Sequence, residues 1–220
     1  FFSKSINIWP PKAWVTKFCD GLFSLAKKNN ITLIGGDTTK GLENSISITI
    51  TAIGYAPKNK AITRSKAKPG DNIYLSGEVG LAGYLIDQIY NNKKLDNKLK
   101  QEYIKLINTP MPQNQLGINL RDIASSCIDI SDGLCADLYH ILDLSNVSAN
   151  LYIDKFKIPK MLNKLPQDKA LEHILYGGDD YQLCFTAPQT EPQVEPQAEP
   201  QNLINNKIIF PIVLLIIGGI

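Results

Sequence analysis

The chain has 220 residues, which is long enough to bury a sizeable core in one large domain or two small ones. Its 44% hydrophobic and 20% charged residues are ordinary for a globular protein, and its formal charge of +2 comes without a basic run, which argues against a nucleic-acid partner. The scattered cysteines lack a C-x-x-C pair, which argues against a zinc site or a disulfide framework and fits a reducing cytosol.

The first part of the chain combines a helical pattern with two strand patterns. Residues 14–28 carry apolar side chains at helical spacing, which predicts an amphipathic helix. Residues 31–34 form a short apolar run, and residues 45–51 alternate between apolar and polar, so both predict strands. Between them, residues 35–41 read G-G-D-T-T-K-G, where the glycine pair permits close approach to a ligand and Asp37 presents a carboxylate. An ordinary hairpin loop fits the same residues.

The middle of the chain begins with a connection over residues 61–70 into a second unit. The predicted elements that follow are a strand over 72–77, a helix over 80–90, a short helix over 101–107 and a helix over 116–125. Residues 109–112 are expected to be extended, because each of their two prolines disfavours helix in the residue before it.

Residues 127–138, reading C-I-D-I-S-D-G-L-C-A-D-L, predict a strand, a tight turn and a helix. Asp129 and Ser131 share the polar face of the strand, and Asp132 lies in the turn. Because no Lys or Arg neutralises these carboxylates nearby in the sequence, a hard cation such as Mg²⁺ is expected to join them. The free N–H groups at the start of the helix suit a phosphate. Alternatively, Asp132 caps the helix and Asp129 is solvated.

The last part of the chain predicts a strand over residues 146–153, a helix over 168–175 and a strand over 182–186. Before the last strand stands G-G-D-D-Y, whose acidic pair, Asp179 and Asp180, could hold a metal, orient a substrate or belong to a simple turn. An E-P-Q repeat follows and predicts an extended, solvated insert. The apolar residues 208–217 predict a buried strand, since they are too few for a membrane helix; a tail anchor is the alternative.

Four motifs in order resemble the thiamine-monophosphate kinase family: L-I-G-G-D-T-T-K-G, R-S-K-A-K-P-G-D-N-I-Y-L-S-G, I-D-I-S-D-G-L-C-A-D-L and G-G-D-D-Y-Q-L-C-F. The resemblance covers residues 14–186. It implies an α/β (α+β) fold of two domains, similar to aminoimidazole ribonucleotide synthetase, with an N-terminal dimerising sheet domain and a C-terminal α/β domain. The implied division is 1–66 for the first domain, 67–187 for the second, 188–201 for the insert and 202–220 for a returning strand.

The resemblance also implies a function, namely transfer of a phosphoryl group from ATP to thiamine monophosphate with Mg²⁺, in a cytoplasmic homodimer without a nucleic-acid or membrane partner. The implied nucleotide-binding residues are Gly36, Asp37, Arg64 and Ser131. The implied Mg²⁺ ligands are Asp37, Asp129 and Asp132, and Asp179 is the implied substrate-binding residue. No catalytic side chain is expected beyond these metal and phosphate ligands, because the acceptor is already a phosphate oxygen.

Two alternatives remain open at this stage: another ATP-using enzyme of the same superfamily, such as a purine or selenophosphate synthetase, or a non-catalytic truncated remnant. The chain departs from the family at Leu81, where an aspartate is usual. The family's N-terminal aspartate-rich segment and C-terminal aromatic region are also absent. We therefore expect this chain by itself to be inactive.

Overall fold

The computed structural model describes residues 10–39, 46–91, 101, 106–189, 210–212 and 216–217, the last two ranges through their backbone alone. The chain divides into two compact units, Phe1–Tyr55 and Ala56–Ile220, and each is described here by itself. The domain boundary after residue 66 stays a prediction. The E-P-Q insert and the end of the first glycine motif, Lys40 and Gly41, lie outside the described residues.

The first unit contains helix α1, Lys12–Lys28, as the apolar spacing predicted. Trp14 and Phe18 lie one turn apart and stack with their ring centroids 5.6 Å apart. The helix ends at Asn29, and the next residue, Asn30, adopts a left-handed φ of 55° that turns the chain away. No residue of α1 is buried within this unit.

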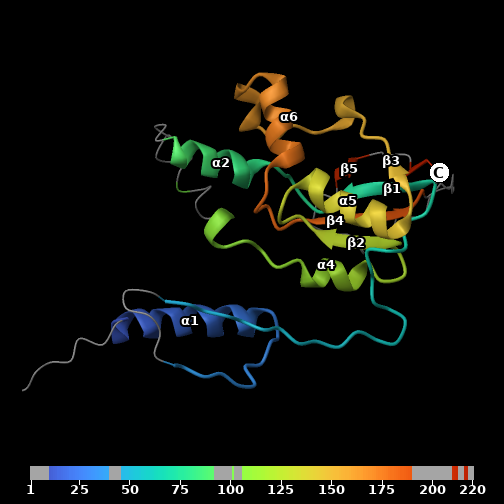
Figure 1. The fold of residues 1–220 in the computed structure, drawn as a ribbon. Coiled ribbons are helices and arrows are strands. Elements are labelled where there is room, and N and C mark those ends of the chain that lie inside the picture. Colours follow the sequence, from blue (N-terminus) through green and yellow to red (C-terminus); the bar gives the residue numbers. More distant parts are fainter. Residues whose placement is uncertain are drawn as a thin grey trace, which may run out of the picture. The chain divides into compact units, whose positions relative to one another are not determined.

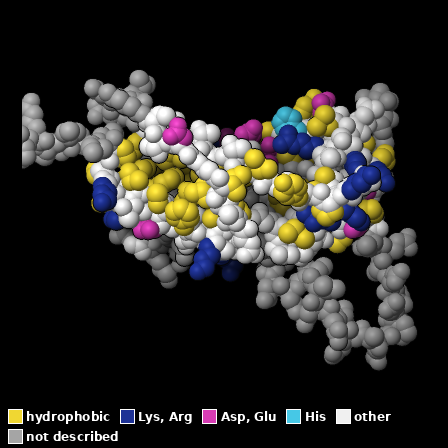
Figure 2. Space-filling view, turned by 90° about the horizontal axis from the view of Figure 1, so that it is seen from below, with side chains coloured by type: hydrophobic (Ala, Val, Ile, Leu, Met, Phe, Trp, Pro, Cys, Tyr) yellow, Lys and Arg dark blue, Asp and Glu magenta, His cyan; other side chains and the backbone are white. Residues whose placement is uncertain are grey.

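The strands expected at residues 31–34 and 45–51 are wrong for the part that the structure describes: residues 31–39 and 46–55 form no strand. An alternating pattern fits one face of a sheet but does not supply the neighbouring strand that completes the hydrogen bonds. Their apolar side chains consequently remain exposed, Ile34 to 84% and Ile53 to 77%. Figure 2 shows apolar side chains gathered on the face of the molecule that it presents.

The second unit is built on an antiparallel sheet with the strand order β2-β4-β1-β5 (Figure 1). Its strands are β1, Asp71–Leu75; β2, Ser126–Asp129; β4, Leu183–Pro188; and β5, Phe210–Ile212. A second, two-stranded sheet pairs β3, Ser148–Ala149, with β6, Ile216–Ile217. The alternation predicted around β2 is confirmed, because Ile128 and Ile130 are buried while Asp129 is exposed.

Helices pack against this sheet and complete the core. The described helices of this unit are α2, Leu81–Tyr90; α4, Asn114–Asn119; α5, Leu134–Ser145; α6, Gln167–Tyr176; and the 3-10 turns η1, Ile153–Lys155, and η2, Leu162–Lys164. Helix α5 contacts β2 and β4, and α6 contacts both α5 and α2. Buried apolar side chains of the sheet and helices form one cluster that includes Ile73, Leu75, Ile130, Leu138, Ile141, Leu162 and Ile174.

Three predicted elements differ from the structure in extent. Helix α4 stops at Asn119 rather than at residue 125, because Asp122 takes a left-handed φ of 69° on the way into β2. The strand predicted over residues 146–153 shrinks to the two residues of β3. Residues 102–105 of the predicted helix over 101–107 lie outside the described residues, and the described residues 101, 106 and 107 are helical, as predicted. Strands β5 and β6 fall within the apolar run predicted as a returning strand.

Candidate active site

Three loops of the second unit leave the sheet at the same end. The antiparallel register sets the last residue of β2, Asp129, opposite the first residue of β4, Leu183. The pairing continues beyond the strands, since the N–H of Ile130 donates to the carbonyl of Gln182 at 2.7 Å. The end of β1 joins them, because the N–H of Ser76 donates to the carbonyl of Leu183 at 2.9 Å. The loops after β1, after β2 and before β4 are therefore neighbours.

The turn after β2 is held by Asp137, a residue of the first turn of α5. One oxygen of its buried carboxylate, Oδ2, accepts hydrogen bonds from the N–H groups of Ser131, Asp132 and Gly133 at 2.9, 3.0 and 3.1 Å. Asp137 thus occupies the N–H of the N-cap residue Gly133, and a phosphate at the first N–H groups of α5 stays a prediction. Gly133 is the N-cap of α5, so the alternative in which Asp132 caps the helix is wrong.

The G-G-D-D-Y loop before β4 docks directly onto this turn. The N–H of Asp179 donates to the carbonyl of Ser131 at 2.9 Å. A Cβ on Gly178 would lie only 2.5 Å from the same carbonyl oxygen, so a glycine is required there. Asp179 and Tyr181 both take left-handed φ angles, 64° and 49°, which side chains rarely adopt. The loop is therefore held in an uncommon backbone conformation beside the turn.

The second aspartate of the loop, Asp180, turns away toward helix α2. Its carboxylate accepts hydrogen bonds from the N–H groups of Gly80 at 2.5 Å and Ala82 at 3.1 Å. Burial raises the pKa of Asp180 to about 6, although the hydrogen bonds from Gly80, Ala82 and Leu81 oppose that rise. Asp180 thus ties the start of α2 to the loop and is not available as a ligand.

Three aspartates remain directed to solvent near one hydroxyl group. Asp129, Asp132 and Asp179 are all exposed. The hydroxyl of Tyr181 donates to Oδ1 of Asp179 at 3.1 Å. This hydrogen bond raises the pKa of Tyr181, and the charges of Asp129 and Asp132 raise it further. The negative charges of the three carboxylates therefore act at the same place.

The donor set fits a magnesium ion better than a transition metal. In the described ranges, no three His, Cys, Asp or Glu side chains converge closely enough to hold a metal ion by themselves. Mg²⁺ commonly takes only one or two carboxylates and completes its coordination with water and substrate phosphates. Asp129 and Asp132, two exposed carboxylates on one strand end and its turn, match that pattern.

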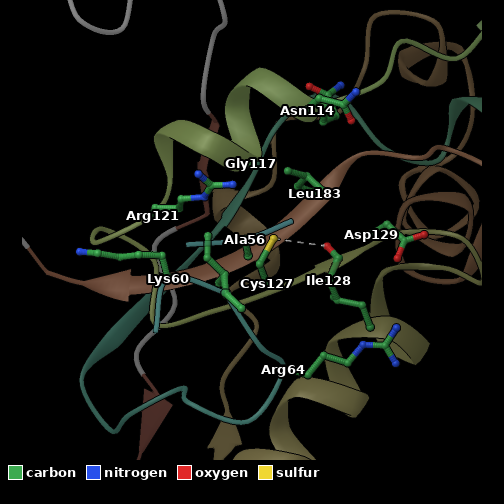
Figure 3. A pocket seen from close by; sticks show the side chains of 13 residues that line it. Ala56, Lys60, Arg64, Asn114, Gly117, Arg121, Cys127, Ile128, Asp129 and Leu183 are labelled. Carbon is green, nitrogen blue, oxygen red and sulfur yellow. Dashed lines mark hydrogen bonds between the residues drawn. The ribbon is translucent and has the colours of Figure 1, made fainter. Parts of the chain in front are cut away.

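Beside this strand end lies an open cavity of about 520 Å³ (Figure 3). Both arginines of the chain, Arg64 and Arg121, line it together with Lys60 and Asp129. Lys60 forms an ion pair with Asp122. Among the described residues, neither arginine takes part in an ion pair. The cavity thus offers two uncompensated guanidinium groups, which suit an anionic ligand such as a phosphate chain.

The backbone around Arg64 is fixed by contacts with β2 and α5. Cys127 donates its N–H to the carbonyl of Thr63 at 3.2 Å, and Ser145 donates its hydroxyl to the carbonyl of Arg64 at 3.0 Å. Arg121 comes from the segment after α4 and lies in Figure 3 on the other side of Cys127. Burial, followed by the charge of Asp129, raises the pKa of Cys127 to about 11, so this thiol is not a nucleophile near neutral pH.

The predicted site residues fall into two groups. Asp129, Ser131, Asp132 and Asp179 come together at the sheet end, and Arg64 lines the cavity that Asp129 also lines. Gly36 and Asp37 belong to the first unit; Asp37 is exposed and accepts the N–H of Thr38 at 2.8 Å. Their roles stay predictions.

Sequence reasoning missed Arg121 and Asp137, and it did not separate the scaffold role of Asp180 from the exposed position of Asp179. Asp137 had a signal, since an acidic residue in the first turn of a helix is favourably placed for the free N–H groups there. Asp180 had none, because its partners lie about 100 residues away in the chain. The missed residues hold the loops together or line the cavity.

Comparisons with known proteins agree with the fold and identify the class. A family described as "AIR synthase related protein, N-terminal domain" matches residues 1–56. A crystal structure of thiamine-monophosphate kinase from Stenotrophomonas maltophilia shares the fold with a TM-score of 0.69 and 33% identity, over 81% of this chain and 57% of that one. The expected α/β fold related to aminoimidazole ribonucleotide synthetase is confirmed.

Curated relatives to which the chain is similar are thiamine-monophosphate kinases. The thiamine-monophosphate kinase of Haemophilus influenzae is 42% identical over 180 residues, which are 80% of this chain and 53% of the relative. A structure of AaThiL complexed with AMPPCP and TMP shares the fold at 22% identity and a TM-score of 0.57, over 72% of this chain and 48% of that one. The chain is thus a homologue of the thiamine-monophosphate kinases, as the four motifs indicated, and spans about half the length of the curated relatives it matches.

Proposed function

We propose that the protein to which this chain belongs is a phosphotransferase that transfers a phosphoryl group from ATP to thiamine monophosphate and yields thiamine diphosphate. The observation that carries the proposal is the cavity in which Arg64 and Arg121 lie beside Asp129. A site for a nucleotide and a second phosphate ester needs cationic groups and metal-binding carboxylates side by side. Support comes from the relatives named thiamine-monophosphate kinase and from the AaThiL complex with AMPPCP and TMP.

The nucleotide is proposed to enter this cavity. The guanidinium group of Arg64 would grip phosphate oxygens in a bidentate manner that a lysine cannot provide. Ser131 lies in the turn that follows β2 and is proposed to contact the nucleotide. Gly36 and Asp37 are proposed to contribute from the first unit.

Magnesium is proposed to be held by Asp37, Asp129 and Asp132. When bound, the ion would offset the negative charge of the phosphates and of the transferred group. The chain's own contribution is to hold the carboxylates in place, which it does through the turn after β2. No general base is required, because the acceptor is a phosphate oxygen.

Asp179 is proposed to bind the thiamine substrate. Thiamine carries a positively charged thiazolium ring, and a carboxylate attracts it. Asp179 is exposed and held by Tyr181, so its carboxylate can face a ligand with little loss of side-chain freedom.

We further propose a homodimer in the cytoplasm, without nucleic-acid or membrane partners. Several apolar side chains of the first unit are exposed, among them Ile34, Ile50 and Ile53, and a second copy could cover them. All four cysteines are free, in agreement with a reducing compartment. Of the helices that the structure describes, none combines the length and the apolar character needed to cross a membrane.

The test uses the protein as its gene encodes it. The protein is incubated with ATP, Mg²⁺ and thiamine monophosphate, and the thiamine phosphates are separated by chromatography. Formation of thiamine diphosphate supports the proposal, and Arg64→Gln should raise the KM for ATP about tenfold. ATP consumption with other acceptors, but none with thiamine monophosphate, would indicate a different ATP-using enzyme of the superfamily.

A further inference from the structure

Asp137 carries a buried carboxylate that is neither a metal ligand nor a substrate-binding group in the function proposed above. Its side chain is only 3% exposed. The ion pairs among the described residues are Lys60–Asp122 and Lys169–Glu172, so no cation neutralises it there. Three backbone N–H groups, those of residues 131–133, converge on its Oδ2 instead. A buried carboxylate is costly unless such bonds satisfy it, so its presence demands a reason.

The three N–H groups belong to the turn that carries the proposed metal ligand Asp132. A short turn has few restraints of its own, and Gly133 within it has a φ of 126°, which few residues adopt. The bonds to Asp137 fix the orientation of three successive peptide units. They thereby fix where the Cα of Asp132 lies and in which direction its side chain leaves the backbone.

The same turn also receives the loop that carries Asp179. The carbonyl of Ser131 belongs to the same peptide unit as the N–H of Asp132, and it accepts the N–H of Asp179 at 2.9 Å. One buried carboxylate therefore holds the backbone on which two exposed site carboxylates depend. The remaining site carboxylate, Asp129, lies at the end of β2 and is held by the sheet.

We propose that Asp137 is a positioning residue that sets the geometry of the metal-binding carboxylate Asp132 and of the docked Asp179. The inference rests on the proposed function for the roles of those two aspartates. Residues that orient metal ligands through hydrogen bonds alter metal affinity about 10- to 100-fold when changed. A carboxylate that merely starts helix α5 would alter stability and leave metal affinity unchanged.

The experiment compares the isosteric variant Asp137→Asn with the unchanged protein. Its matched control is Ala170→Gly. Ala170 is buried in α6, and its N–H donates to the carbonyl of Pro166, the N-cap residue of that helix. Glycine in a helix interior destabilises the helix, so this variant reports the effect of lost stability alone on the turn and on the metal. All measurements are made at a temperature where each protein is fully folded by circular dichroism.

The first arm measures hydrogen exchange by NMR at the amides of Ser131, Asp132 and Gly133. In the unchanged protein we expect protection, and in Asp137→Asn an exchange about tenfold faster at these three amides than in Ala170→Gly. If these three amides exchange without protection in the unchanged protein, the proposal that Asp137 holds the turn is wrong, even if Asp137→Asn fails to fold. Asp137→Glu, which keeps the charge but moves the oxygens, serves as a second variant.

The second arm measures binding of Mn²⁺ by electron paramagnetic resonance of the free ion. We expect the dissociation constant to rise about tenfold or more in Asp137→Asn and to stay within twofold in Ala170→Gly. Equal affinity in all three proteins, or no Mn²⁺ binding by the unchanged protein, overturns the inference. Weakened Mn²⁺ binding together with a failure to form thiamine diphosphate would sustain the role of Asp137 while refuting the proposed reaction.

Discussion

The carboxylate of Asp180 accepts a hydrogen bond of 2.5 Å from the N–H of Gly80, a residue 100 positions earlier in the chain. This contact stabilises the N-terminus of α2, where the N-cap glycine offers no side chain of its own. It also ties the loop after β1 to the G-G-D-D-Y loop. One aspartate of that loop thus serves the scaffold, while the carboxylate of its neighbour Asp179 is exposed.

The first prediction concerns the pH dependence of stability. The pKa of Asp180 in the folded protein is raised from 3.8 to about 6, so the folded state binds a proton more tightly than the unfolded state. The resulting stabilisation is complete below pH 3.8 and is lost as the pH rises through about 6. We expect the titration of Asp180 to lower the free energy of unfolding by on the order of 3 kcal/mol across this window.

The measurement is denaturant unfolding between pH 4 and 7.5 of the unchanged protein and of Asp180→Asn. The variant cannot titrate at this position, so its stability should fall less as the pH rises. Asp154→Asn, a change at an exposed aspartate, is the matched control and should leave the profile unchanged. Parallel pH profiles for the unchanged protein and Asp180→Asn would contradict the prediction.

The second prediction concerns the close approach of two loops. Gly178→Ala would place a Cβ 2.5 Å from the carbonyl oxygen of Ser131, which belongs to the backbone and cannot move aside cheaply. We expect a loss of about 1–3 kcal/mol in the free energy of unfolding. Gly117→Ala in α4 meets nothing within 4 Å and should be neutral or stabilising. Equal stability of the two variants would show that the loops are not in contact in solution.

The third prediction concerns the cavity. Arg121→Gln removes one of the two uncompensated guanidinium groups that line it. We expect the dissociation constant of a non-hydrolysable ATP analogue, measured by calorimetry, to rise about tenfold, which corresponds to about 1.4 kcal/mol. Lys169→Gln removes the same charge from an exposed ion pair on α6 and should have no such effect. Similar small effects of both variants would mean that only the net charge matters.

The fourth prediction concerns the metal site. Under the proposed function, Asp132→Asn should abolish Mg²⁺-dependent formation of thiamine diphosphate, because one of the carboxylates proposed to hold the ion is lost where several kcal/mol of charge compensation are needed. Asp132 is exposed, so the variant should fold normally and melt within about 2 °C of the unchanged protein. Near-normal turnover in a folded Asp132→Asn protein would remove this residue from the metal site.

Much of the second unit could be predicted from local patterns, because each pattern reports a relation between neighbouring residues. The alternation around Ile128 and Ile130 indicated one buried face, and both side chains are buried. The turn at Asp132 and the helix after Gly133 follow from the same short stretch. These features also gave the positions of the exposed carboxylates.

The features that could not be predicted depend on partners distant in the sequence. Nothing near Asp180 reveals that it reaches the start of α2, and nothing near Arg121 reveals the cavity it shares with Arg64. The strands expected over residues 31–34 and 45–51 failed for a related reason. Their patterns describe a surface that could join a sheet, but a strand exists only where another strand pairs with it.

The place of β4 in the sheet has a consequence for synthesis of the protein on the ribosome. β4 lies between β2 and β1, yet it follows both of them in the chain. While translation proceeds, β1 and β2 therefore emerge without the neighbour that will join them, and each presents unpaired backbone groups. The loops around Asp132 and Asp179 can meet only after residues 183–188 have left the exit tunnel. Nascent chains shorter than this should remain sensitive to protease and dependent on chaperones.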